Sequence, residues 1–275
     1  MQASAVGESR RLKWEPSARW GLRAALAGLT IAAAVYLLAL VAGADGVGEW
    51  MRWTDLALLG VSSLGVLVAW ARATLESRRH WWLVTMAFAG AAFGELWLAA
   101  GASTWLHEQW PTPADLGMLV FLGCMIAFLM RHLRSGDRTT LVVHLLDAAL
   151  LALAVIFILW ELVIARGVGD MGRLSLVTQI LVVLYPALDV FIASIVLLLL
   201  LVDRSPARVM LFMGMVSLAV GDTMASAGLG RVTGAAVSVS SVAWVVGLVC
   251  VVTALAVPAG ARLTARRPTL RRLML

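Results

Sequence analysis

The sequence predicts an all-α, polytopic membrane protein with eight transmembrane helices, and two observations carry this prediction. Hydrophobic residues make up 61% of the 275 residues and charged residues only 14%, with a mean hydropathy of +0.92. The apolar residues also gather in runs of about 20, the length of helix that crosses the hydrocarbon core of a bilayer. Lipid is therefore the expected solvent, and a soluble globular fold is excluded.

Hydropathy places the transmembrane domain at residues 20–258, between a basic N-terminal segment (1–19) and a basic tail or connector (259–275). The expected spans are 20–42, 55–73, 81–101, 114–133, 141–165, 175–202, 207–228 and 237–258. The first apolar run is already of spanning length, so we expect no cleavable signal peptide before it.

Basic residues set the expected orientation, because Lys and Arg in short loops favour the cytoplasmic side. Of the 22 basic residues, 18 fall on one side of the predicted spans and 4 on the other. The smaller group is Arg52, Arg166, Arg173 and Arg231. Both termini are therefore expected in the cytoplasm, with the chain in the cytoplasmic (inner) membrane. The net charge of +6 then belongs to loops facing lipid headgroups, and no nucleic-acid binding is expected.

The third and fourth spans carry close-packing signals next to acidic residues. Gly90 and Gly94 are four residues apart, a spacing that lets another backbone approach, and Glu95 follows directly. In the fourth span, Pro113 suits a helix start and Asp115 falls in the first turn, where a carboxylate complements the helix dipole. We therefore expect Asp115 to cap its helix.

The sixth span is the segment around which the predicted site is arranged. Leu, Ile, Val and Phe dominate residues 181–202, so insertion outweighs the roughly +3 kcal/mol that Asp189 costs at mid-membrane. Pro186 has no amide to bond the carbonyl of Val182, which makes it the expected hinge of this helix. Tyr185 and Asp189 are four residues apart and should share the face beside that carbonyl.

The chain also shows a weak internal similarity between its third and seventh spans. Gly94-Glu95 and Gly221-Asp222 are each followed, three residues later, by a run of three small residues, at an offset of 127 positions. A 4+4 tandem repeat of helices would explain this offset and would put a site at the interface of the two halves. The loop at 203–208 is short enough to force spans six and seven into an antiparallel hairpin.

Five acidic residues are expected at one depth, in the outer half of the bilayer. Asp55, Glu95, Asp115, Asp189 and Asp222 each lie 14 to 17 residues from the nearest inner arginine, or roughly 21 to 26 Å along a helix. No Lys or Arg lies in the spans at this level, so each acid must be protonated, hydrogen-bonded or neutralised by a cation. We expect local hydrogen bonds for Asp55 and Asp115, and an outward-facing pocket shared by Glu95, Asp189 and Asp222.

Other chemistries are weaker fits. The only lysine, Lys13, precedes the spans, which excludes a retinal Schiff base of the rhodopsin type. A haem held by His132 and His144 is one alternative. An intramembrane aspartyl protease built on Asp189 and Asp222 is another, although the sequence before Asp222 lacks the first Gly of the GxGD signature. We expect no metal site, and the sequence identifies no cofactor.

Over residues 55–262 the chain resembles the N-terminal multi-helix sensor region of actinobacterial cyclic-di-GMP signalling proteins, in which cytoplasmic GGDEF and EAL domains follow the membrane part. The resemblance lies in Pro111-Thr112-Pro113-Ala114-Asp115, Leu146-Asp147-Ala148-Ala149, Tyr185-Pro186-x-x-Asp189, Gly221-Asp222 and Trp244. The chain departs from the family at Leu188, where a Gly is frequent, and in a tail without the usual His-Pro. No GGDEF, EAL or kinase motif occurs up to Leu275, so the chain itself is expected to be non-catalytic.

The resemblance implies a membrane-embedded sensory or input module of a signal transduction protein. Its candidate ligand-binding or proton-sensing residues are Glu95, Tyr185, Asp189, Asp222, Asp115 and Trp244. The expected partners are the bilayer, a small ligand or cation from outside, a cytoplasmic signalling domain or protein, and a second copy of the chain in a homodimer. The alternative is a small transporter or channel that uses the same carboxylates as a cation or proton path.

Overall fold

In the computed structural model of this chain, the described residues are 16–43, 47–75, 81–102, 112–133, 138–161, 176–202, 204–228 and 234–257. Within these ranges the structure is helical and contains no strand. The long helices are α1 (Pro16–Val41), α2 (Val47–Leu75), α3 (Trp81–Trp97), α5 (Pro113–Leu133), α6 (Arg138–Leu159), α8 (Leu176–Val202), α9 (Pro206–Gly228) and α10 (Gly234–Ala256). A π-helical turn, η1 (Leu98–Ala102), extends α3.

Each of the eight long helices is long and apolar enough to cross a membrane. The prediction of a polytopic all-α membrane protein with eight spans is thereby confirmed. The predicted tail at 259–275 lies outside the described residues, as does the N-terminal segment up to residue 15. Residues 16–19 begin α1 rather than belonging to a separate segment.

The second span differs most from its prediction. The helix begins at Val47 rather than at residue 55. The prediction was late because the polar residues Glu49, Arg52 and Thr54 lower the hydropathy of this first part, although it is helical. Thr54 Oγ1 donates a hydrogen bond to the carbonyl of Trp50, 2.9 Å away within the same helix. Asp55 therefore lies two turns inside the helix and not at its start.

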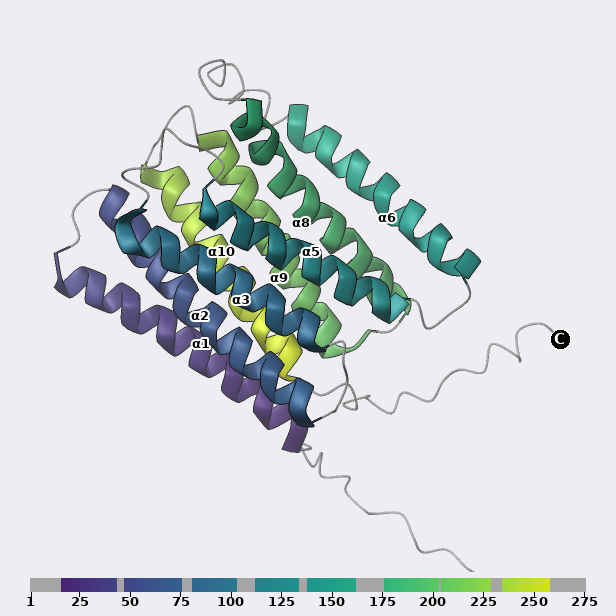
Figure 1. The fold of residues 1–275 in the computed structure, drawn as a ribbon, viewed down its shortest axis with the longest axis horizontal. Helices are drawn as coiled ribbons and strands as arrows, with labels where there is room; N and C mark the ends of the chain where they lie inside the picture. The colour runs from purple at the N-terminus through teal and green to yellow at the C-terminus, as the bar shows by residue number, and fades with distance from the viewer. Residues whose placement is uncertain are drawn as a thin grey trace, which may run out of the picture.

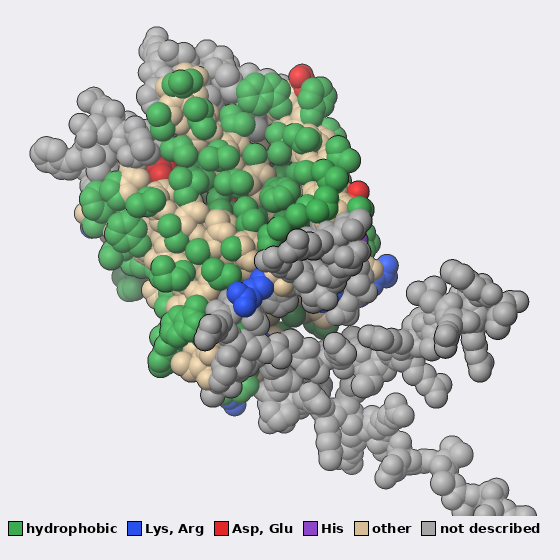
Figure 2. Space-filling view, turned by 45° about the vertical axis from the view of Figure 1, so that its right-hand side comes forward, with side chains coloured by type: hydrophobic (Ala, Val, Ile, Leu, Met, Phe, Trp, Pro, Cys, Tyr) green, Lys and Arg blue, Asp and Glu red, His purple; other side chains and the backbone are tan. Residues whose placement is uncertain are grey.

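The helices form one bundle with α1 and α6 at opposite edges (Figure 1). Helix α10 packs against α1, α2 and α9, and α3 lies between α2 and α5. Helix α6 packs mainly against α8, and most of its large apolar side chains are exposed. Figure 2 shows one face of the molecule, on which hydrophobic side chains cover the described helices and charged side chains are few. Such a surface is suited to lipid rather than water.

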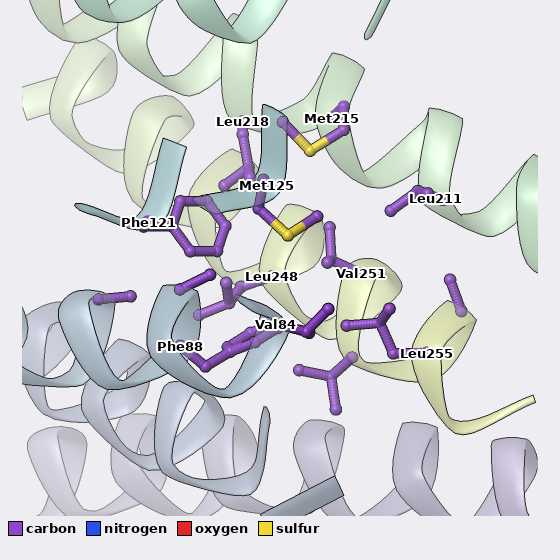
Figure 3. Close-up of a cluster of buried hydrophobic side chains, with 14 of the residues drawn as sticks. Val84, Phe88, Phe121, Met125, Leu211, Met215, Leu218, Leu248, Val251 and Leu255 are labelled. Carbon is purple, nitrogen blue, oxygen red and sulfur yellow. The ribbon is translucent and has the colours of Figure 1, made fainter. Parts of the chain in front are cut away.

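The core lies where α3, α5, α9 and α10 meet, and its side chains point toward one another (Figure 3). Phe88, Phe121, Met125 and Met215 are almost fully buried there, and the Phe88 and Phe121 rings meet edge to face, with centroids 5.7 Å apart. Because lipid tails are as apolar as these side chains, close packing rather than water exclusion must hold the helices together.

Glycines bring two pairs of helices into backbone contact. Between α3 and α5, a Cβ at Gly90 would lie 2.7 Å from the carbonyl oxygen of Gly117, and one at Gly94 would lie 3.0 Å from that of Ala114. Between α9 and α10, Gly214 and Gly247 approach each other's carbonyl groups in the same way. The close approach predicted from Gly90 and Gly94 is confirmed, with α5 as the partner.

With the exception of Arg52, near the start of α2, the arginines in the described helices gather at one end of the bundle. Arg72 donates a hydrogen bond to the carbonyl of Val257, 3.1 Å away, and its guanidinium lies 4.9 Å from the ring centroid of Trp81. Arg208 donates to the carbonyl of Leu199 at 2.8 Å and so ties the start of α9 to the end of α8. The end of α2, the start of α3 and the end of α10 therefore lie together, which we call the arginine end.

Candidate functional site

A cavity of about 250 Å³ lies within the bundle, in the half away from the arginine end. Six of the long helices contribute to its wall: α2, α3, α5, α8, α9 and α10. Its apolar lining includes Leu58, Met118, Leu218 and Leu248. Its polar lining is Asp55, Ser62, Glu95, Tyr185, Asp222 and Trp244. A mostly apolar wall with a few converging polar groups is the usual composition of a ligand site.

Glu95 is a buried acid of the cavity wall with an unbonded oxygen atom. Its side chain is only 8% exposed, and its Oε2 atom has no hydrogen-bond partner among the described residues. Asp55 and Asp222 interact with it electrostatically across the cavity. The Ser62 hydroxyl, which is fully buried and lines the same cavity, likewise has no hydrogen-bond partner in the part of the chain that the structure describes. An unpaired polar group held away from water is costly, so the cavity contains unused capacity for hydrogen bonding.

Asp222 and Asp189 form a hydrogen-bonded carboxyl pair between α9 and α8. Because a carboxylate has no proton to donate, such a bond exists only when one of the two groups is protonated. Asp222 also accepts a hydrogen bond from the indole Nε1 of Trp244, 2.6 Å from Oδ1. Gly221 allows this contact, since a Cβ there would overlap the Trp244 ring. Asp189 itself is 2% exposed and lies behind Asp222.

Asp115 caps α5, as the sequence predicts, and has a second role in joining two helices. Its Oδ2 accepts hydrogen bonds from the Thr112 amide at 2.7 Å and the Thr112 hydroxyl at 2.8 Å. In return, the Thr112 hydroxyl lies 3.4 Å from the Asp115 amide, completing a reciprocal cap. Asp115 Oδ1 accepts the Tyr185 hydroxyl at 2.7 Å. Tyr185 thus links α8 to the start of α5.

The predicted grouping of the acids requires two corrections. Asp55 was expected to bond locally, but it lines the cavity together with Leu58 and Ser62, which lie on the same face of α2 at helical spacing. Asp189 was expected in a pocket with Glu95 and Asp222, whereas only the latter two line the cavity. Their shared depth could be deduced from the sequence, but the rotation of each helix could not.

The remaining predicted features have mixed outcomes. Pro186 is buried within a helix that continues through it. Ser62 was not predicted, although its spacing from Asp55 puts both residues on one helical face. His144 lies on the edge helix α6 and is half-buried. Within the described helices, no three His, Cys, Asp or Glu side chains converge in a way that could hold a metal ion.

These features define a multi-pass helical membrane protein with a buried acidic cavity between its helices. No family model matches the chain, no curated protein matches it, and no solved structure matches it.

Proposed function

We propose that the chain is the sensory input module of a signal transduction system in the cytoplasmic membrane, with both termini in the cytoplasm and a cavity that opens to the outside. The observation that carries the proposal is the cavity itself, which joins six helices around Glu95 and Asp222. A site shared by so many helices can bias how they pack, which is what a sensor requires. The concentration of arginines at one end of the bundle supports the orientation.

The resemblance to cyclic-di-GMP sensors supports the same function. Its motif residues Asp115, Tyr185, Asp222 and Trp244 contact one another or line the cavity, and Asp189 bonds to Asp222. These residues come from four helices that are distant in the sequence. The catalytic output would come from a cytoplasmic signalling domain or partner protein, since the chain carries none of the corresponding motifs.

A mechanism follows from the connections of the carboxyl pair. A ligand or proton entering the cavity changes the charge beside Asp222, whose partner Asp189 lies three residues after Pro186 on α8. The missing backbone bond at Pro186 makes this part of α8 easier to bend. The Arg208 contact to Leu199 couples the ends of α8 and α9 at the inner face. A difference of about 1.4 kcal/mol in ligand affinity between two packings would shift their ratio tenfold.

We also propose that the bundle is a 4+4 tandem repeat. Matching neighbours support it: α1 packs on α2 as α6 packs on α8, α2 on α3 as α8 on α9, and α3 on α5 as α9 on α10. Glu95 and Asp222 occupy corresponding positions in this scheme and face the same cavity. A cavity at the interface of two halves is the expected position for a site in such an arrangement.

The test separates a sensor from a transporter. A diguanylate cyclase domain fused after Leu275 gives a measurable output, cyclic-di-GMP, as the outside pH is varied between 5 and 8. Proteoliposomes of the unfused chain with an internal pH-sensitive dye measure proton flux. A sensor changes cyclase output severalfold without catalysing flux, and Asp222→Asn abolishes the change. Flux above that of empty liposomes with constant cyclase output would establish the transporter instead.

A further inference from the structure

The cavity contains hydrogen-bond acceptors that nothing in the described structure uses. Glu95 Oε2 and Ser62 Oγ both lack a partner, both side chains are more than nine-tenths buried, and both belong to the cavity wall. Asp55 adds a third acceptor group to the same wall. The other acid of the wall, Asp222, is already bonded to Trp244 and Asp189. The unused capacity therefore lies on the α2 and α3 side.

The charge of the wall selects a cationic ligand. Glu95, Asp55 and Asp222 supply three carboxyl groups, and none of the described residues that line the cavity is Lys, Arg or His. An anion would meet like charges at low dielectric, which is strongly unfavourable. A neutral ligand would leave the three carboxyl groups without a counter-ion. A cation instead restores the electrostatic balance and occupies the free acceptors.

The arrangement of donors favours an organic cation over a metal ion. Among the described residues, no set of three acidic, His or Cys side chains converges closely enough to coordinate a metal. The rest of the wall is apolar, with Leu58, Met118, Leu218 and Leu248 around the acids. A volume of about 250 Å³ exceeds the roughly 30 Å³ occupied by one water. It has room for an apolar body as well as a charged head.

We propose that this cavity binds a small primary amine, whose ammonium group donates hydrogen bonds to Glu95 and Ser62 while its hydrocarbon body packs against the leucines and Met118. A primary ammonium has three N–H donors and no acceptor, which matches the unbonded acceptors of Glu95 and Ser62 and the carboxyl group of Asp55 in the same wall. The inference rests on the proposed function, because it names the ligand class of the sensing cavity.

Binding to the full chain in lipid nanodiscs, measured by isothermal titration calorimetry at pH 7, tests this proposal. The probes are 2-phenylethylamine, cyclohexylmethylamine and n-pentylamine, with 2-phenylethanol as the neutral counterpart of the first. At least one amine is expected to bind saturably, and at least tenfold more tightly than the alcohol binds. Equal affinity of 2-phenylethylamine and 2-phenylethanol, or no saturable binding of any of the three amines, overturns the proposal.

Variants assign the binding to Glu95. Glu95→Gln keeps the shape and removes the charge, so amine affinity should fall at least tenfold while alcohol affinity stays the same. Ser62→Ala should weaken amine binding severalfold. Glu161→Gln, at an exposed position on the edge of the bundle, is the matched control and should bind like the wild type. If Glu95→Gln fails to fold, Glu95→Asp, which retains the charge on a shorter side chain, should show intermediate affinity. Wild-type affinity in either Glu95 variant would exclude Glu95 as the anchor.

This experiment can fail independently of the sensory function. If amine binding depends on Glu95 but the cyclase fusion never responds, the ligand class is supported and the sensory function is contradicted. If the fusion responds to outside pH but none of the amines binds, the sensory function is supported and the ligand class is contradicted.

Discussion

Tyr185 contributes to the stability of the fold through its hydroxyl group, which joins α8 to α5 by donating a hydrogen bond to Asp115. Removing the Tyr185 hydroxyl leaves the Asp115 carboxyl oxygen without its donor, and a buried acceptor left unsatisfied costs about 1–3 kcal/mol. We expect Tyr185→Phe to lower the free energy of unfolding by that amount, measured by denaturant or thermal unfolding in detergent.

Tyr36→Phe is the matched control for this change, because Tyr36 is the only other tyrosine and its hydroxyl makes a longer contact, 3.3 Å, to the neutral Thr54. The control should cost less than Tyr185→Phe. If both variants unfold like the wild type, the Tyr185 contact makes no net contribution to the joining of α8 and α5.

The carboxyl pair of Asp189 and Asp222 gives stability a dependence on pH. The hydrogen bond between the two carboxyl groups needs one proton, and removing it would leave two adjacent negative charges, with Glu95 close to Asp222. Loss of that proton breaks the hydrogen bond, so the free energy of unfolding of the wild type should be lower at alkaline pH, where the proton is lost. Asp189→Asn keeps a donor for Asp222 without needing a proton, so its melting temperature should vary less between pH 6 and pH 9.

Asp147→Asn serves as the control for this prediction, since Asp147 is exposed on the edge helix α6. It should show the wild-type dependence on pH. Parallel melting curves for the wild type and Asp189→Asn across this range would mean that the pair does not govern the dependence.

At the scale of elements, α5 contains two glycines with opposite surroundings. A Cβ at Gly117 would overlap the Gly90 carbonyl oxygen and lie 2.9 Å from the Gly94 amide nitrogen, whereas one at Gly123 meets nothing within 4 Å. Backbone atoms of α3 cannot move aside singly, so the two helices would have to separate. We expect Gly117→Ala to destabilise the fold by about 1–3 kcal/mol, and Gly123→Ala to be neutral or to stabilise it by up to about 1 kcal/mol.

Unfolding of the two variants in one detergent measures this difference, with helix content before unfolding as a check on folding. Equal stabilities would show that the close approach of α3 and α5 contributes little, and that the side chains around Phe88 and Phe121 hold this crossing.

The elements also show how far the sequence could lead. Hydropathy located all eight helices, because a run of about 20 apolar residues has few alternatives in lipid. It placed the start of α2 eight residues late, since Glu49, Arg52 and Thr54 resemble a loop by hydropathy alone. Interfacial residues can be helical and polar together, and only packing on α1 and α3 distinguishes such a helix end from a loop.

For the molecule as a whole, the depth of each acidic residue in the membrane was predictable, but the direction in which its side chain points was not. Counting from the inner arginines placed the acids in one layer, because rise per residue in a helix is constant. Which acid meets which depends on the rotation of each helix about its axis. That rotation is set by contacts such as Gly221 against Trp244 and Gly90 against Gly117, and a single sequence does not reveal such pairings. Asp189 thus bonds to Asp222 behind the cavity, and Asp55 enters its wall.

The orientation of the bundle can be tested with single cysteines. The two native cysteines, Cys124 and Cys250, lie within helices and are half-buried, so replacing them with Ala gives a background without strongly reactive thiols. Arg204→Cys puts an exposed thiol between α8 and α9, at the arginine end, and Ala42→Cys puts one after α1 at the opposite end.

In intact cells, a membrane-impermeant maleimide should label Ala42→Cys and leave Arg204→Cys unlabelled, and both should react once the cells are permeabilised. The reason is the distribution of charge: arginines that pair with helix ends at one face, such as Arg72 and Arg208, favour the cytoplasmic side during insertion. Labelling of Arg204→Cys in intact cells would show that the bundle has the opposite orientation in the membrane. The layer of acids would then lie near the inner face, and the cavity could no longer receive a ligand from outside.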